Sequence, residues 1–129
     1  MDPQALFSND AAAGALNIEF VDGGYGEVRL AMTVTEAMLN IVSTCHGGVL
    51  FTLADSAMQI ASNAGESMAF ASTANMQYIA PAHAGDRLIV TVTRRLRRGK
   101  VTHHTGEVVG PNGVVALFDG TTIDVAKRD

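Results

Sequence analysis

The stretch NIVSTCHGGVLFTLADSAMQIASNA, residues 40–64, decides the fold of this chain. Its apolar residues recur at the i, i+3, i+4 and i+7 positions that give an α-helix one buried face. These residues are Leu50, Leu53, Ala54, Ala57, Ala61 and Ala64. Gly65 follows them and is of the residue type that commonly ends helices. We therefore expect one long helix whose apolar face lies in the core.

The opposite face of the expected helix is polar but almost uncharged. It carries Thr52, Asp55, Ser56, Gln59, Ser62 and Asn63. Asp55 is the only formally charged residue between Glu36 and Glu66. A solvated helix face normally carries many charged side chains, so we expect this face to lie against a cleft or another subunit. The alternative is an amphipathic helix with one ordinary surface aspartate.

Two glycines at the expected helix start suggest a binding site for a developing anion. Gly47 and Gly48 follow His46, where the first backbone N–H groups of a helix lack intrahelical partners. Glycine has no Cβ, so a substrate oxygen can approach closely, and the helix dipole favours negative charge there. The pattern suggests acyl transfer, in which the Gly47 N–H polarises a carbonyl group and Asp55 attacks its carbon or activates a water.

Length and composition predict a single domain over residues 1–129. Of the 129 residues, 47% are hydrophobic and 17% are charged, which suits one globular core and is too little chain for two ordinary domains. The low charge content suggests a buried subunit contact. No apolar run is long enough to predict a membrane span, and the net charge of −4 argues against nucleic acid as a partner.

The N-terminus and the cysteine content indicate a cytoplasmic setting. The first residues, MDPQALFSND, lack the basic and apolar parts of a secretory signal. Cys45 is the single cysteine, so no intrachain disulfide can form. A reducing cytoplasm is the compartment in which such a chain is expected.

The remaining sequence predicts strands around the helix. Residues 1–14 form an N-terminal helical segment, with Asp2 and Pro3 at a helix start. Alternation predicts strands over residues 16–21 and 25–34, joined by a turn at residues 22–24. Further strands are expected over residues 68–80, 86–97, 100–109 and 114–125. This order predicts an α+β fold, with one antiparallel sheet of about five to six strands wrapped around one long central helix.

Basic residues are concentrated in one short segment. Of the nine Lys and Arg residues, more than half lie between positions 94 and 100. They are Arg94, Arg95, Arg97, Arg98 and Lys100. Such a cluster can bind phosphate groups. The alternative is a hairpin tip whose charges only keep the protein in solution.

Several separated motifs resemble one known family. They are Asn40, the run from Cys45 to Ala57, Asn63, YIAPA at residues 78–82, Gly85-Asp86 and Arg98-Gly99-Lys100. Together they resemble the hotdog-fold acyl-CoA thioesterases, specifically the phenylacetic acid degradation subfamily, over most of the chain after the N-terminal segment. The resemblance implies two protomers joined through the edges of their sheets, a homodimer at minimum, with pairs of dimers forming homotetramers.

The resemblance also implies an activity and a substrate. The enzyme would hydrolyse the thioester of an acyl-CoA, with an aryl-acetyl or hydroxylated phenylacetyl group among the candidate acyl groups. The products would be a free acid and coenzyme A. No cofactor is implied, because coenzyme A is part of the substrate.

The same resemblance assigns catalytic roles to four residues. Asp55 would be the catalytic carboxylate, acting as general base or as nucleophile. The Gly47 N–H would bind the oxyanion, and His46 and Asn40 would line the catalytic site.

Substrate-binding roles follow from the resemblance too. Gly48 would line the site, and Arg98, Gly99 and Lys100 would lie near the coenzyme A moiety. Ser72 or Thr73, on the strand after the helix, would assist from the partner subunit. The chain departs from the subfamily pattern in two places: Met58 stands where an aromatic residue is common, and Val42-Ser43-Thr44 replaces a more glycine-rich approach to His46. These departures leave the acyl group open.

Other arrangements have less support in the sequence. Cys45 and His46 are adjacent in an extended segment, so their side chains point to opposite sides and make a poor nucleophile and base pair. The histidines show no helical H-x-x-x-H pair and no cysteines at ligand spacing, so no metal is expected. A hotdog hydratase or dehydratase would need a histidine after Asp55, and the helix has none. A non-catalytic acyl-CoA-binding hotdog protein is the alternative from a different class.

Overall fold

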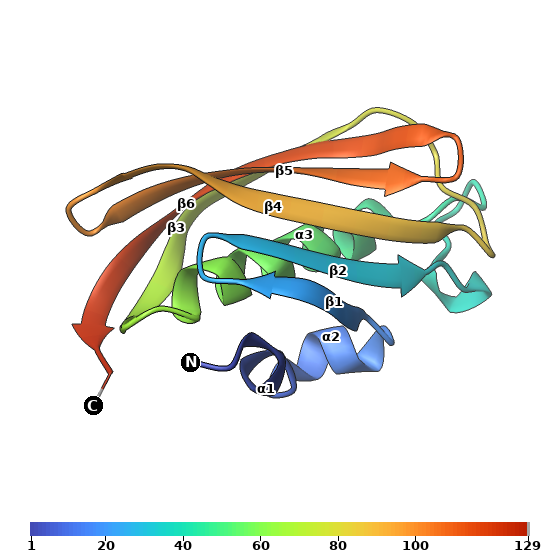
Figure 1. Cartoon of the computed structure of the whole chain (residues 1–129). Coiled ribbons are helices and arrows are strands. Elements are labelled where there is room, and N and C mark those ends of the chain that lie inside the picture. Colours follow the sequence, from blue (N-terminus) through green and yellow to red (C-terminus); the bar gives the residue numbers. More distant parts are fainter. Residues whose placement is uncertain (129) are drawn as a thin grey trace.

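The computed structural model describes residues 1–128, which form one six-stranded sheet and one long helix (Figure 1). In chain order the elements are α1 (Pro3–Phe7), α2 (Ala11–Ala15), β1 (Glu19–Gly24), β2 (Glu27–Thr33), a 3-10 turn η1 (Glu36–Met38), α3 (Gly47–Asn63), β3 (Ser67–Tyr78), β4 (Arg87–Arg98), β5 (Val101–Gly110) and β6 (Gly113–Lys127).

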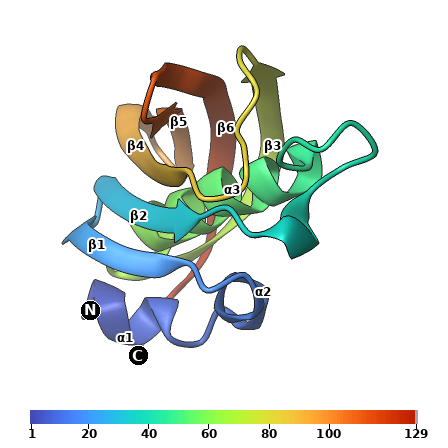
Figure 2. The same cartoon turned by 90° about the vertical axis from the view of Figure 1, so that its right-hand side faces the viewer.

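The sheet wraps around α3. Its strand order is β1-β2-β4-β5-β6-β3, and every neighbouring pair is antiparallel. Seen along the helix, the strands curve over one side of α3, and α1 and α2 close the side near β1 (Figure 2). This arrangement confirms the predicted α+β fold. The last four strands begin and end within two residues of their predicted bounds.

The core lies between α3 and the concave face of the sheet. Leu53, Ala54 and Ala57 are 0% exposed, as are Leu30 of β2 and Val90 of β4. In each strand the residues that alternate with these face away from α3, which is the period-two pattern of a half-buried sheet. All of the apolar helix positions predicted to be buried are buried. No helix among the described residues is long and apolar enough to cross a membrane.

The N-terminal segment differs from its prediction. One short helix was expected, but Asp2 and Asp10 each begin a helix by accepting a backbone N–H, from Gln4 and Ala13 respectively. Two N-cap aspartates eight residues apart therefore divide the segment, because each cap sets an extended residue before a helical turn.

The first hairpin also turns at another place. The predicted turn at residues 22–24 is part of β1, and the chain reverses at Tyr25-Gly26. Gly26 has φ +89° and donates its N–H to the Ala61 carbonyl at 3.0 Å. The Tyr25 ring lies under the Arg94 guanidinium, at 5.0 Å from the ring centre. These contacts with distant residues favour the later turn, and a local sequence pattern does not contain them.

Candidate active site

The first turn of α3 leaves one backbone donor free. His46 is the N-cap residue, and its Nδ1 accepts the N–H of Gly48 at 3.0 Å. The N–H of Gly47, the first residue of the helix, makes no hydrogen bond to another described residue. Of the two glycine donors predicted for an anion site, Gly47 is therefore the available one. An acceptor at Nδ1 also means that a neutral His46 carries its proton on Nε2.

Tyr78 packs directly on Gly47. Its hydroxyl donates a hydrogen bond to the Gly47 carbonyl oxygen at 2.9 Å. A Cβ at position 47 would lie 2.9 Å from the phenol ring, so glycine lets Tyr78 pack this closely, and a larger residue there would make the half-exposed ring move aside. The sequence assigned no role to Tyr78, although it begins the YIAPA motif. Tyr78 joins the end of β3 to the start of α3.

A cavity of about 400 Å³ opens beside the start of α3. Its lining residues include Asn40, Thr44, Gly47, Leu50, Tyr78 and Pro81. Asn40 shapes its rim, because Oδ1 accepts the N–H groups of Val42 and Thr44 at 3.0 and 3.1 Å. The Asn40 side chain thus holds the loop before the helix, a role that its predicted place in the site did not include.

Asp55 lies two turns further along α3. It is half-buried, and burial is the main cause that raises the pKa of its carboxyl group above the ordinary value. A hydrogen bond from the Gln59 side chain opposes this shift, and the carboxylate of Asp10 adds to it. A raised pKa is typical of carboxylates that act as proton acceptors near neutral pH.

The predicted polar face of the helix divides into two parts. Ser56 and Ser62 are buried, at 4% and 6% exposed, so the prediction that the whole face meets a cleft or subunit was wrong for them. Ser56 donates to Asp10 Oδ2 at 2.7 Å, and Ser62 lies in a polar cluster under the sheet. Small hydroxyl side chains are tolerated inside when they have partners. Thr52, Asp55, Gln59 and Asn63 are partly exposed.

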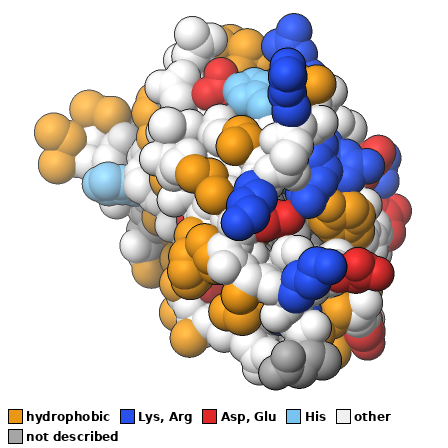
Figure 3. Space-filling model, turned by 90° about the vertical axis from the view of Figure 1, so that its left-hand side faces the viewer, with side chains coloured by type: hydrophobic (Ala, Val, Ile, Leu, Met, Phe, Trp, Pro, Cys, Tyr) orange, Lys and Arg blue, Asp and Glu red, His pale blue; other side chains and the backbone are white. Residues whose placement is uncertain are grey.

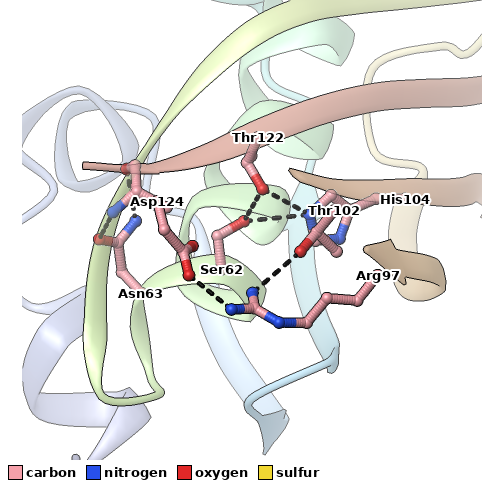
Figure 4. Close-up of polar contacts among 8 residues, drawn as sticks. Ser62, Asn63, Arg97, Thr102, His104, Thr122 and Asp124 are labelled. Atoms are coloured by element: carbon pink, nitrogen blue, oxygen red, sulfur yellow. Dashed lines mark hydrogen bonds and ion pairs between the residues drawn. The ribbon is translucent and has the colours of Figure 1, made fainter. Parts of the chain in front are cut away.

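The polar cluster at the end of α3 is formed by Ser62, His104 and Thr122 (Figure 4). His104 is 1% exposed, and its Nε2 lies 2.9 Å from Thr122 Oγ1 and 3.1 Å from Ser62 Oγ. Ser62 Oγ is also 2.9 Å from the Met58 carbonyl oxygen. Burial, with smaller contributions from His103 and Arg94, lowers the pKa of His104 to about 4. The cluster is closed to solvent and has no access to the cavity beside Gly47.

Ser72 and Thr73 of β3, the two residues predicted to assist from the partner subunit, differ in their hydrogen bonding. A bulge lies between Ala71 and Thr73, so Ser72 is the extra residue of the edge strand. Ser72 Oγ donates to the Thr121 carbonyl at 3.3 Å, whereas the Thr73 hydroxyl makes no hydrogen bond to a described residue. Bulges often re-aim side chains next to active sites. Thr73 therefore has the free hydroxyl of the two.

The basic segment lies at the opposite end of the molecule from Gly47. Arg98, Gly99 and Lys100 lie at the tip of the β4–β5 hairpin, next to Ser67 at the start of β3 (Figure 1). Figure 3 views this end and shows the Lys and Arg side chains gathered on it. Arg97 is paired with Asp124 at 2.6 Å. Arg98 and Lys100 are exposed.

Neither a metal site nor a reactive cysteine is found among the described residues. The described residues contain no group of three or more His, Cys, Asp or Glu side chains placed to hold a metal ion. Cys45 is buried, and burial raises the pKa of its thiol to about 11. A thiol with this pKa is protonated and unreactive at neutral pH.

The sequence and the fold place the chain among known proteins. A profile of the Thioesterase superfamily matches residues 43–106. The chain is 38% identical to the acyl-coenzyme A thioesterase PaaI of Escherichia coli (strain K12) over 117 residues, which are 90% of this chain and 84% of that protein. The chain belongs to the thioesterase superfamily.

Solved structures narrow the class. The PaaI protein from the phenylacetic acid degradation operon of E. coli has a TM-score of 0.91 at 36% identity, over 95% of this chain and 90% of that chain. A variant of the phenylacetic acid degradation protein PaaI from Thermus thermophilus has a TM-score of 0.86 at 33% identity, over 90% and 100% of the two chains. These similarities confirm the predicted hotdog fold and the phenylacetic acid degradation type of thioesterase.

Proposed function

We propose that the protein hydrolyses acyl-CoA thioesters to a free acid and coenzyme A, without a further cofactor. The observation that carries the proposal is the free N–H of Gly47 at the positive end of a long helix that also carries the half-buried Asp55. The N–H polarises the thioester carbonyl and stabilises the oxyanion as it forms. Asp55 either removes a proton from the attacking water or attacks the carbon itself. A relative at 38% identity is an acyl-coenzyme A thioesterase, which supports the substrate class.

Helix geometry argues that two protomers share each site. Eight residues separate Gly47 from Asp55, and an α-helix rises 1.5 Å per residue, so they lie about 12 Å apart along the axis. An oxyanion donor must lie about 3 Å from the carbonyl oxygen, and a base or nucleophile must be equally close to the reacting atoms. One small thioester group does not span both residues of one helix. We propose that Asp55 of one protomer works with Gly47 of its partner.

The edge strand β3 supplies the contact. It has one neighbour, β6, so its other side presents unpaired backbone groups. No residue from Ser67 to Tyr78 carries a formal charge, and Phe70 is 61% exposed. A long, uncharged edge of this kind favours pairing with a second copy. We propose that β3 pairs antiparallel with the β3 strand of the partner.

The direction of β3 supports this pairing. Tyr78 contacts Gly47 at the start of α3, and Asn63 at the end of α3 bonds the backbone of Ala69, so β3 runs antiparallel to the helix. A two-fold axis perpendicular to the paired β3 strands makes the partner's β3 and α3 run in the opposite direction to those of the first protomer. If the axis passes through the second half of β3, the start of the partner's α3 lies alongside Asp55. In the same arrangement Thr73, with its free hydroxyl, lies at the contact.

The basic hairpin completes the proposed site. Arg98 and Lys100 lie at the Ser67 end of β3, beyond Asp55 and away from their own Gly47. We place the phosphates of coenzyme A there, because an extended nucleotide can reach from the shared thioester site to the hairpin. Arg and Lys are the usual partners of phosphate. We place this reaction in the cytoplasm.

A further association is proposed for the outer face of the sheet. Ile89, Leu117 and Ile123 are 38 to 41% exposed on strands whose other face packs on α3. No helix of the described chain covers that face. Packing of two such faces would bury these side chains. We propose that pairs of dimers form tetramers in this way.

A panel of acyl-CoA thioesters tests the proposed activity. Short aliphatic, phenylacetyl and hydroxyphenylacetyl thioesters are incubated with the protein, and the free thiol is followed spectroscopically. We expect turnover of at least one member well above the uncatalysed rate. Binding of acyl-CoA by calorimetry without thiol release across the whole panel would instead identify a non-catalytic binding protein.

A further inference from the structure

The N-terminal segment contacts α3 through one fixed carboxylate. Asp10 Oδ2 accepts the hydroxyl of Ser56 at 2.7 Å, and Asp10 Oδ1 accepts the N–H of Ala13 at 3.0 Å. Both oxygens are therefore used, one to begin α2 and the other to hold α3. Ser56 is buried and directly follows Asp55 in the chain. The contact lies on the helical turn that carries Asp55.

We propose that Asp10 is a positioning residue for the reaction: its carboxylate, held against α3 by the Ser56 hydroxyl, fixes the turn on which Asp55 lies and keeps a second negative charge near Asp55. The proposal rests on the catalytic role given to Asp55 above. It gives the N-terminal segment, which lies outside the region matched by the superfamily profile, a part in the chemistry.

The electrostatics follow from the placement of Asp10. A second carboxylate nearby disfavours the ionised form of Asp55, as burial also does, and both raise its pKa. A base is most effective when its pKa lies near the operating pH, because a carboxylate with a higher pKa holds the abstracted proton more firmly. The two hydrogen bonds of Asp10 hold its carboxylate at a fixed position relative to α3.

Several titratable and charged groups from the elements packed on α3 have partners of their own. They are Asp2, Glu19, Arg29, Arg94, His104 and Asp124. Asp2 caps α1, and His104 bonds the hydroxyl of Thr122. Glu19, Arg29 and Asp124 form ion pairs with Arg87, Asp22 and Arg97 respectively. Arg94 lies over the ring of Tyr25. Strand β3 brings no formal charge. The carboxylate of Asp10 is the neighbouring charge that raises the pKa of Asp55, in addition to burial.

Asp10→Asn removes the negative charge of residue 10 while keeping the size and shape of its side chain. Asparagine is nearly isosteric and is a good N-cap: its Oδ1 can accept the Ala13 N–H while its Nδ2 donates to the Ser56 hydroxyl oxygen, so α2 and its contact with α3 persist. The pH profile of kcat/KM should keep its form, while its acidic limb moves to lower pH, as expected for the loss of one nearby negative charge. Asp10→Ser is a second neutral cap and should shift the limb in the same direction.

Two matched variants test whether overall charge or the hydrogen bond to Ser56, rather than the charge of Asp10, moves the acidic limb. Asp2→Asn makes the same change at the cap of α1, which has no hydrogen bond to α3, so the acidic limb should not move. Ser56→Ala removes the hydrogen bond but keeps the charge of Asp10. It should leave the limb in place, lower kcat several-fold because the turn that carries Asp55 is no longer fixed, and lower the melting temperature by about 5 °C, as expected for one lost hydrogen bond in a domain of this size.

The outcomes distinguish this inference from the proposed function. If Asp55→Asn is inactive but Asp10→Asn leaves the limb unmoved or moves it to higher pH, the role of Asp10 is wrong and the proposed function stands. An equal shift in Asp2→Asn would also overturn it, because the effect would then be one of overall charge. If Asp55→Asn remains active, the proposed function fails first.

Discussion

The polar groups at the two ends of α3 differ in hydrogen bonding and in exposure to solvent. At the first turn the Gly47 N–H is unbonded and lies beside a cavity of about 400 Å³. Near the last turn Ser62 bonds His104, Thr122 and the Met58 carbonyl in a sealed cluster. Unused donors at an open surface can bind a substrate, whereas hydrogen-bonded groups in the core, here the two hydroxyls and Nε2 of His104, hold the fold. Variants at the first end should therefore change chemistry, and variants at the second should change stability.

Asp55→Asn is expected to have the largest effect. The amide is close to isosteric but is neither a base nor an effective nucleophile, so kcat/KM should fall by about 10² or more. The thermal unfolding temperature and subunit assembly should be retained. Activity above roughly a tenth of the parent's would be far outside the loss expected for a general base and would remove Asp55 from the mechanism.

Gly47→Pro tests the free donor at the first end. Proline is tolerated at the first helical position and lacks the N–H, so kcat should fall by about 10². Its Cβ requires the half-exposed Tyr78 ring to move aside. Gly47→Ala is the control, because it adds the same Cβ but keeps the N–H. Equal losses in the two variants would mean that the contact with Tyr78, and not the donor, matters.

His104 tests the opposite end through the pH dependence of stability. Its pKa is about 4 in the folded protein and 6.5 when unperturbed, so the unfolded chain takes up a proton first. The contribution to stability is complete above pH 6.5 and is lost as the pH falls towards 4, by about 3 kcal/mol in all. Nδ1 of His104 has no partner among the described residues, so a second proton would have no acceptor.

Denaturant unfolding between pH 4 and 7 measures this dependence. His104→Gln, which does not titrate, should lose this part of the pH dependence while kcat at neutral pH stays near the parent's. A variant with an unchanged stability profile would show that other groups cause the loss. A large fall in kcat would contradict a purely structural role.

The smallest effect is expected at the basic hairpin. Arg98→Ala or Lys100→Ala should raise KM for acyl-CoA several-fold, about 1 kcal/mol, with little change in kcat, because a remote phosphate contact binds ground and transition states equally. High salt should reduce the difference by screening. A truncated thioester without the nucleotide is the control substrate. Equal impairment on that substrate would rule out a phosphate contact.

The sequence predicted what depends on local pattern. The buried face of α3, the four strands after it and the free donor at Gly47 follow from spacing that the chain carries within a few residues. The family resemblance rested on motifs from Asn40 to Lys100 and is confirmed by the relatives. The fold was therefore within reach of the sequence.

What escaped prediction depends on contacts between distant residues. Ser56 looked like part of an open polar face, and only the position of Asp10, 46 residues earlier, shows why it is buried. Tyr78 gained its role from a hydrogen bond to Gly47 across 31 residues. The separation of the basic hairpin from its own Gly47 is a property of the sheet topology. No local pattern contains these relations.

Mixed assemblies test the central claim, that each site joins Asp55 of one protomer to Gly47 of its partner. Asp55→Asn and Gly47→Pro chains, each inactive alone, are co-expressed in equal amounts and their thiol release is compared with the parent's. Half of the random pairs are mixed, and each mixed pair has one site with both groups intact, so about a quarter of the parent activity should return. If both groups acted within one chain, every site would lack one of them, and the mixture would be as inactive as the two variants alone.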